Sequence, residues 1–253
     1  MYLEKTTMEL TGFGAVILAA GKGTRMKSDL AKVLHKVGDK AMVVRVIESI
    51  QPLIPHHTHV VVGHQADQVK AEVRAHAADT RFALQEELLG TGDAVKAALP
   101  GLDDDVTDVL VLCGDIPLIQ TRTLEDLMVS HRENKAAVTV LAVTVDTPKG
   151  YGRIIQDDQG QVSAIREEAD ASEQEKLIQQ VNSGIYCFQR RFLEEGIQKL
   201  HPENNQKEYY LTDLIGMAVE SGLKTSCKTM DDPVQVMGVN TLEELEKAAL
   251  SIR

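Results

Sequence analysis

The sequence predicts an α/β fold, in which helices flank both faces of a mostly parallel, Rossmann-like sheet. Short apolar runs alternate with amphipathic segments between residues 15 and 115, and this alternation is typical of β-α-β units. An apolar run also passes directly into a glycine-rich turn, in the stretch VILAAGKGTRM that begins at Val16. After Pro117 the strands become longer and a hairpin pattern follows. We therefore expect a second, smaller lobe that continues the first.

Four strands and three helices are expected in the first part. The run AVILA at 15–19 is short and uninterrupted, as in a strand buried on both faces. Further strands are expected at 59–63, 81–85 and 108–115. The helices are expected from helical spacing in AMVVRVIESI, from the pair Val69 and Val73, and over 93–99. Ligands of such sheets bind at the carboxyl ends of the strands.

The second part is predicted from its own patterns. We expect a helix at TLEDLMVSH, a strand at 136–145, a hairpin over 151–168 with DDQG as its turn, and a strand at 182–188. A helix over 209–222 ends at Gly222, a strand covers 234–240, and Thr241 caps a final helix. The expected organisation is a tail at 1–13, one domain at 14–240 with halves at 14–117 and 118–240, and a C-terminal helix at 241–253.

Composition excludes several classes of protein. The 253 residues carry a net charge of −11, so a nucleic-acid surface is not expected. The three cysteines give neither a disulfide framework nor a paired metal motif. The apolar runs are shorter than the roughly 18 residues that span a bilayer, and the first residues do not resemble a signal peptide. We expect a cytoplasmic protein without a membrane partner.

The glycine-rich turn fits neither common phosphate loop. Met26 stands where a dinucleotide fingerprint needs its third glycine, and the order of Lys22 and Gly23 excludes a Walker A loop. Small residues still allow the backbone N–H groups to approach a ligand. Arg25 can bind phosphate with two hydrogen bonds, and Lys32 adds a point charge. The stretch therefore predicts a triphosphate site, with an ordinary surface turn as the alternative.

The stretch LAAGKGTRMKSDLAKVLHKV closely resembles the opening of sugar-1-phosphate nucleotidylyltransferases. The segments QEELLGTGDAV, CGDIPL, YGRI, NSGIY, EYYLTD and GVN continue the resemblance in order, over residues 14–240. More narrowly, the chain is similar to the uridylyltransferase domain of bacterial N-acetylglucosamine-1-phosphate uridylyltransferases. That resemblance implies a nucleotide-diphospho-sugar transferase fold with a sugar-binding lobe. It also implies Mg²⁺-dependent transfer from UTP to N-acetylglucosamine 1-phosphate. Another sugar phosphate or nucleotide, and a non-catalytic nucleotide-sugar binding protein, are the alternatives.

The resemblance also implies roles for individual residues. Arg25 and Lys32 match the phosphate-contacting catalytic cations, and Asp115 and Asn240 match the two protein ligands of Mg²⁺. The sugar-binding positions are Gly152, Glu167 and Asn182, with Glu168 as the alternative to Glu167. The nucleotide-binding positions are Leu18, Ala19, Ala20, Gly21, Gly23, Gln85, Gly90 and Thr91.

Plainer structural roles remain open for several of these residues. Asp115 is also typical of a turn before Pro117, and Asn240 of a helix cap or turn. Gln85 is otherwise a surface residue at a strand end, and Thr91 a helix cap. At the sugar-binding positions the alternatives are a hairpin glycine, a solvated acid and an amide at a strand end.

The sequence departs from the family at Ala31, Cys113 and Asp93. Ala31 stands where proline usually precedes the lysine, so we expect a looser approach to Lys32. Cys113 and Asp93 stand where tyrosine and histidine are common, which leaves base selectivity open.

Two further features have no part in the predicted site. His56, His57, His59 and His64 are expected to be exposed residues near the start of a strand rather than metal ligands. Bifunctional members of the family continue into hexapeptide repeats that carry acetyltransferase activity and form trimers. Such repeats do not occur in this sequence, so we expect no acetyltransferase activity, while other oligomers remain possible.

Overall fold

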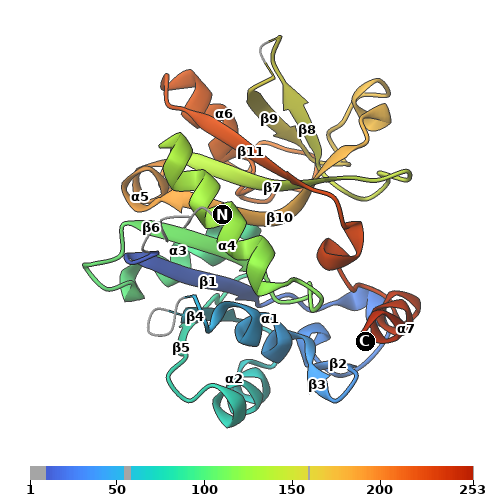
Figure 1. Cartoon of the computed structure of the whole chain (residues 1–253). Coiled ribbons are helices and arrows are strands. Elements are labelled where there is room, and N and C mark those ends of the chain that lie inside the picture. The colour runs from blue at the N-terminus through green and yellow to red at the C-terminus, as the bar shows by residue number, and fades with distance from the viewer. Residues whose placement is uncertain (1–9, 54–57, 159, 253) are drawn as a thin grey trace, which may run out of the picture.

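The computed structural model of the chain describes residues 10–53, 58–158 and 160–252. One sheet runs through the whole molecule in the strand order β11-β7-β10-β6-β1-β4-β5 (Figure 1). β10 (Gln180–Gln189) is antiparallel to both of its neighbours, and the other pairings along this path are parallel. The predicted Rossmann-like α/β fold is confirmed, and the second lobe extends the same sheet.

The first half contains the predicted elements with small shifts of their ends. Its strands are β1 (Phe13–Ala19), β4 (Thr58–Val62), β5 (Arg81–Leu84) and β6 (Asp108–Cys113). Its helices are α1 (Met42–Ile50), α2 (Ala66–His76) and α3 (Thr91–Ala98). A small hairpin, β2 (Lys36–Val37) and β3 (Lys40–Ala41), was not expected from the sequence. Of the expected tail, residues 1–9 lie outside the described residues, and Phe13 already belongs to β1.

The second half contains α4 (Thr121–Asn134), β7 (Val138–Thr144) and the hairpin of β8 (Arg153–Gln156) and β9 (Val162–Arg166). The hairpin is confirmed, although residue 159 of its turn lies outside the described residues. α5 (Arg190–Ile197) and β11 (Thr225–Met230) were missed. α6 (Asp213–Glu220) is shorter than expected, and α7 (Leu242–Ser251) begins after Thr241. The side chain of Thr241 caps α7 as predicted.

The strand expected at 234–240 is wrong. Residues Pro233–Val236 form a short 3-10 turn, in which the Asp232 side chain accepts a hydrogen bond from Val234 N. The chain then crosses toward the end of β6, where Val239 N donates to Asp115 O at 2.9 Å. This crossing buries Val236 and Val239, although Val234 stays exposed, so the apolar pattern of the segment resembles that of a strand.

Two apolar layers hold the helices against the sheet. α1, α2 and α4 cover one face, where alternate residues of β1 such as Ala15 and Ile17 meet them. α3, α5 and α6 cover the other face, where Val16 and Ala20 point. Every residue from Phe13 to Ile17 is therefore buried, as predicted for a strand covered on both faces.

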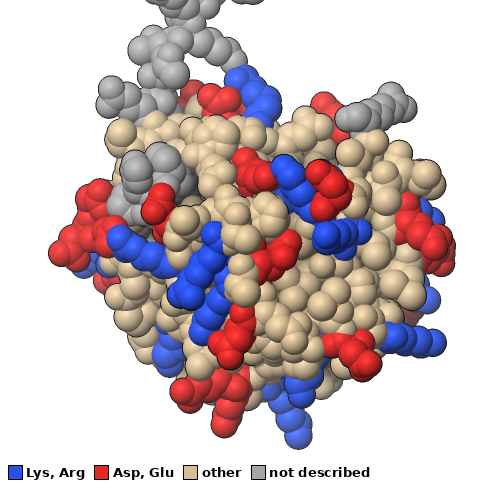
Figure 2. Space-filling view, turned by 90° about the horizontal axis from the view of Figure 1, so that it is seen from below, with Lys and Arg blue, Asp and Glu red and all other residues tan. Residues whose placement is uncertain are grey.

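Figure 2 shows basic and acidic side chains interspersed on one face of the molecule, without a field of a single sign. Within the part of the chain that the structure describes, no helix is long and apolar enough to cross a lipid bilayer.

Candidate active site

A cleft opens at the carboxyl ends of β1 and β6. From β1 the chain proceeds outward to β4 and β5, then returns to β6 on the other side of β1. This reversal leaves a crevice between the loops that follow the two strands, where open α/β sheets bind ligands. Two adjoining cavities of about 260 Å³ and 240 Å³ lie there and share Leu18, Thr91, Cys113 and Asp115 in their walls. After the roles predicted from the sequence, we call the Gln85 side the base end, the Lys32 side the reaction end and the Glu167 side the sugar end.

Most of the predicted residues line this cleft. Seven of the predicted nucleotide-binding residues line the first cavity: Leu18, Ala19, Ala20, Gly21, Gln85, Gly90 and Thr91. Lys32 lines that cavity, Asp115 lines both, and Asn240 lines the second with Gly152, Glu167 and Asn182. Gly23 and Arg25 line neither cavity and lie beside the reaction end.

The glycine-rich turn packs directly on Lys32. Gly23 has a φ of 64°, and a Cβ placed on it would lie 2.4 Å from Lys32 Cβ. Only glycine combines this left-handed conformation with such a close approach. The conformation of Gly23 thus places the turn and the lysine at the same edge of the cleft.

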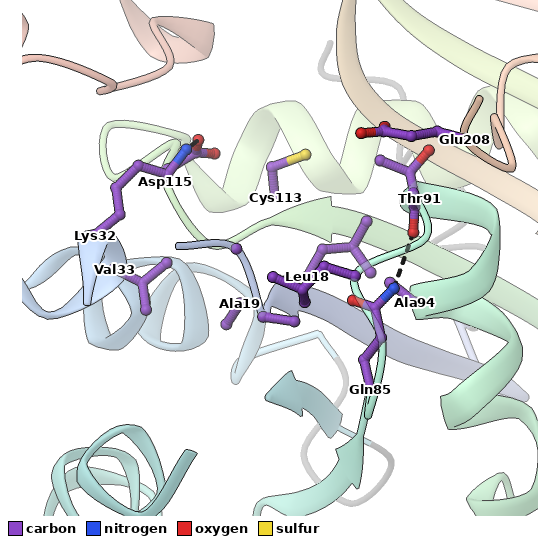
Figure 3. A pocket seen from close by; sticks show the side chains of 14 residues that line it. Leu18, Ala19, Lys32, Val33, Gln85, Thr91, Ala94, Cys113, Asp115 and Glu208 are labelled. Carbon is purple, nitrogen blue, oxygen red and sulfur yellow. Dashed lines mark hydrogen bonds and ion pairs between the residues drawn. The ribbon is translucent and has the colours of Figure 1, made fainter. Parts of the chain in front are cut away.

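The predicted cations and the predicted metal ligands meet at the reaction end. Lys32 Nζ forms an ion pair with Asp115 and donates to Asn240 Oδ1 at 3.0 Å. Arg25 donates to the same oxygen at 2.9 Å. The Lys32 and Asp115 side chains are only 16% and 17% exposed, so water screens this pair less than it would at an open surface. Figure 3 shows Lys32 and Asp115 in contact at one side of the cavity.

The backbone on either side of Asn240 fixes this residue. Asn240 N donates to Glu244 Oε2 at 2.6 Å, and the same oxygen accepts from Thr241 N in the capping box of α7. Asn240 Nδ2 donates to Gly238 O at 3.3 Å, which leaves Oδ1 directed at the two cations. Although Asn240 precedes a helix, the cap itself is Thr241.

The donor set fits a magnesium ion. A carboxylate and an amide oxygen converge on one point, and Mg²⁺ prefers such oxygen ligands, with substrate phosphates and water completing its coordination. Among the residues that the structure describes, no group of three or more His, Cys, Asp and Glu side chains comes together. An ion held by Asp115 and Asn240 would therefore depend on substrate oxygens and water.

Ala31 is held by a side chain in place of the usual proline ring. The residue is buried and has a φ of −53°, close to the proline value, and its N–H donates to Gln65 Oε1 at 2.7 Å. Gln65 Nε2 in turn donates to Asp29 O. One amide side chain therefore binds the loop before Lys32 at two points, and the looser approach to Lys32 stays a prediction.

At the base end, Gln85 is only 5% exposed. Its Nε2 donates to Gly90 O at 3.1 Å and to Asp93 Oδ2 at 2.8 Å. In Figure 3 the amide nitrogen points toward the segment that carries Thr91, and the amide oxygen faces Leu18 and the cavity. The alternative of a surface residue at a strand end is thus excluded.

The two glycines of the GTG segment accommodate a neighbouring backbone. A Cβ on Gly90, whose φ is 115°, would lie 2.7 Å from Tyr209 O, and one on Gly92 would lie 2.4 Å from Leu200 Cδ1. Tyr209 N donates to Leu89 O, and Gly92 N donates to Tyr209 O. These contacts engage the backbone of Tyr209, which lies outside α6.

Thr91 does not cap α3. The N-cap position belongs to Gly90, and the Thr91 hydroxyl accepts a hydrogen bond from Leu211 N at 3.0 Å. The GTG segment and residues 209–211 thereby form one wall between the base and sugar ends.

The sugar end brings its three predicted residues together. A Cβ on Gly152 would lie 3.4 Å from Glu167 Oε2 and 3.5 Å from Asn182 Cβ, so the small residue opens this space. Asn182 Nδ2 donates to the Tyr186 hydroxyl at 2.6 Å, within the irregular part of β10. Glu168 instead contacts the buried Arg153 at 2.7 Å and lines neither cavity. The structure therefore places Glu167, rather than Glu168, in the cleft.

Burial changes the acidity of two groups in the cleft. Burial raises the pKa of Glu167, partly offset by the hydrogen bond that Thr212 donates to Oε1 at 3.1 Å. Burial also raises the pKa of Cys113 to about 12, and the nearby Asp115 acts in the same direction. The thiol therefore stays protonated at neutral pH and is a poor nucleophile.

Sequence reasoning missed several residues of the cleft and its supports. Leu88, Ala94 and Glu208 line the base end, while Gln65 and Glu244 hold the backbone near Lys32 and Asn240. Glu244 could have been found, because Thr241 followed three residues later by glutamate is the pattern of a capping box. Gln65 gave no signal, because its partners are 34 and 36 residues away.

The prediction that these histidines are exposed is wrong for His59. This residue lies in β4, is 2% exposed, and its Nε2 is 2.8 Å from Gly101 O. His56 and His57 lie outside the described residues, and His64 is half-buried.

Comparison with known proteins identifies the family. The sequence profile described as nucleotidyl transferase matches residues 14–233, which include most of the cleft. The chain belongs to the nucleotidyl transferase family. It is 48% identical over 239 residues to the "Bifunctional protein GlmU" of Trichlorobacter lovleyi, covering 94% of this chain and 52% of the relative. It is 46% identical over 236 residues to the protein of the same name from Clostridioides difficile, covering 93% and 50%.

A third relative of that name, from Desulfotalea psychrophila, is 45% identical over 238 residues, which are 94% of this chain and 70% of the relative. The chain thus spans about half the length of the first two relatives. The matched region includes the sheet and most of the loops that form the cleft, so a nucleotidyl transferase fold is supported for this chain.

Proposed function

We propose that the protein catalyses the reaction of UTP with N-acetylglucosamine 1-phosphate to give UDP-N-acetylglucosamine and pyrophosphate. The single observation that carries this proposal is the order of groups along one cleft. A buried amide lies at the base end, two cations and two oxygen ligands lie at the reaction end, and a carboxylate and an amide lie at the sugar end. This order matches the order of base, phosphates and sugar in a nucleotide sugar.

The proposed chemistry needs no protein nucleophile. A phosphate oxygen of the sugar phosphate attacks the α-phosphorus of UTP in line, and the bond from that phosphorus to the oxygen bridging to the β-phosphate breaks. Pyrophosphate leaves with the electron pair. The attacking phosphate is already mostly ionised near neutral pH, since its second pKa is about 6. Catalysis then depends on alignment and on neutralising the charge of the leaving group.

The residues of the reaction end divide this work. Lys32 and Arg25 would neutralise negative charge on the triphosphate. Asp115 and Asn240 would hold Mg²⁺, which supplies further charge neutralisation at the phosphate oxygens when bound. The ammonium group of Lys32 contacts both predicted metal ligands, Asp115 and Asn240. If Mg²⁺ took its place at these ligands, Lys32 Nζ would be free to contact the substrate.

Pyrophosphate release with UTP and each of several sugar 1-phosphates tests the proposal. We expect turnover with N-acetylglucosamine 1-phosphate in the presence of Mg²⁺, and its loss when the metal is chelated. Clear release with glucose 1-phosphate alone would overturn the assigned sugar. Tight binding of UDP-N-acetylglucosamine without any turnover at saturating Mg²⁺ would favour a non-catalytic binding protein instead.

A further inference from the structure

The base end contains a polar arrangement that the proposed reaction does not by itself require. Gln85 is almost fully buried, and its Nε2 has two acceptors, Gly90 O at 3.1 Å and Asp93 Oδ2 at 2.8 Å. Two acceptors account for both protons of the amide nitrogen. Among the described residues, no hydrogen-bond donor reaches Gln85 Oε1.

The orientation of this amide follows from the chemistry of its neighbours. The Gly90 carbonyl and an ionised Asp93 can only accept hydrogen bonds. If the amide were rotated by half a turn, Oε1 would face two other acceptors, with no proton between them. Leaving a buried polar group without a hydrogen bond would lower the population of the rotated amide by on the order of 5- to 100-fold. The observed orientation, with Oε1 toward the cleft, is therefore strongly favoured (Figure 3).

We propose that Asp93 is a positioning residue that fixes the Gln85 amide, so that the base end selects a nucleobase with an N–H donor at the ring position that faces Gln85 Oε1. The proposal rests on the proposed function in one respect, namely that a nucleotide occupies the cleft. It adds the group that determines which base is accepted. Asp93 itself is half-buried in the first turn of α3 and does not line the cavity.

The surroundings of Oε1 make this selection strong. Leu18, Leu88 and Ala94 line the same cavity with apolar groups. A base that enters removes water from Oε1, so the amide oxygen needs a donor from the base itself. Uracil presents an N3–H, whereas cytosine presents a lone pair at the same ring position. The same enclosure that binds uracil therefore rejects cytosine.

A comparison of UTP with CTP tests this inference. We expect the wild-type protein to prefer UTP in kcat/KM by about 10-fold or more. Asp93→Leu removes the acceptor at nearly constant size, and the preference should fall by about 5-fold or more, through a higher KM for UTP. The KM for the sugar phosphate should not change, because Asp93 does not line the second cavity, where the sugar end lies. Asp93→Ala provides a second removal of the acceptor if the leucine variant is unstable.

The controls separate positioning from general disturbance. Asp93→Asn keeps an oxygen that can accept from Gln85 Nε2, and should retain most of the wild-type preference. Glu86→Leu removes an exposed acid from the same loop and should leave the preference unchanged. If Asp93→Asn lost as much of the preference for UTP over CTP as Asp93→Leu, the effect would come from the charge of Asp93. That result would overturn the inference.

The outcomes also separate this inference from the proposed function. If wild-type protein prefers UTP, and both Asp93→Leu and Asp93→Ala keep that preference, the role of Asp93 is wrong while uridylyl transfer stands. If the wild-type protein prefers CTP or a purine nucleotide, the assigned nucleotide fails, and the inference fails with it.

Discussion

The reaction end and the base end of the cleft are built in different ways. At the reaction end, Lys32, Asp115 and Asn240 contact one another mainly through side chains. At the base end, the wall is backbone: Leu89 and Gly92 are hydrogen-bonded to Tyr209, and Gly90 O accepts from Gln85. Side chains can exchange partners when a substrate arrives, whereas a paired backbone keeps its shape. The comparison suggests that the reaction end rearranges during the reaction and the base end does not.

The largest effect should follow from removing the charge of Lys32. Lys32→Ala should lower kcat by about 100-fold or more, because a group that neutralises charge in the transition state is lost. The exposed Lys36→Ala, outside the cleft, serves as the control and should remain close to wild type in pyrophosphate release. Gln85→Ala should instead act mainly on the KM for UTP. If Lys32→Ala and Gln85→Ala lowered kcat equally, the proposed difference between the reaction end and the base end would be contradicted.

A methyl group at Gly90 should test the rigidity of the base end. Gly90→Ala should destabilise the folded protein by roughly 2 kcal/mol, because its φ is positive and the new Cβ would lie 2.7 Å from Tyr209 O. Gly21→Ala is the matched variant, since a Cβ there meets no atom within 4 Å. Denaturant unfolding of both variants measures the difference. A Gly90→Ala protein as stable as Gly21→Ala would show that the wall can move.

The support beneath Lys32 should have a smaller effect. Gln65→Ala removes the amide that holds Ala31 N and Asp29 O, and kcat should fall by about 3- to 10-fold, since one hydrogen bond contributes about 1 kcal/mol. Adding Ala31→Pro to this variant should restore part of the rate. The φ of −53° at Ala31 suits proline, which also lacks the N–H that has lost its partner.

In the wild-type background, by contrast, Ala31→Pro should lower kcat, because Gln65 Oε1 would lose its donor. Single-turnover kinetics of the two single variants and the double variant give the coupling between the positions. Additive losses would contradict a shared role.

The smallest effect concerns the sugar end and its dependence on pH. Burial raises the pKa of Glu167 above its value in the unfolded chain. The ionised carboxylate is therefore less favourable in the folded protein than in the unfolded chain. The free energy of unfolding falls as the pH rises from the pKa of Glu167 in the unfolded chain through its higher pKa in the folded protein. Glu167→Gln should raise the Tm by on the order of 1 °C at pH 8, with the difference vanishing near pH 4. Thermal unfolding across this range checks the sign, while binding of the sugar phosphate should weaken.

The sequence alone determined most of the sheet, most helices and the chemical character of the cleft. Apolar runs and helical spacing are local signals, so β1, β4, β6 and α1 were predicted within a few residues. The sugar-end and reaction-end residues were found through ordered motifs, and the structure brings them to one cleft. The strand predicted at 234–240 failed because burial by a crossing segment gives the same apolar pattern as burial in a sheet.

Only the tertiary structure decided which partners hold these residues. Gln65 reaches Ala31, Tyr209 reaches Gly92, and Asp115 meets Lys32 across separations of 34 to 117 residues. Such contacts depend on how distant segments pack, and no local pattern in the chain encodes them. The orientation of Gln85 is decided over a shorter range: its Nε2 is bound by a carbonyl and a carboxylate 5 and 8 residues further along the chain, where the loop after β5 enters α3. Most residues of the cleft could thus be predicted from the sequence, whereas packing determined the direction in which each side chain points.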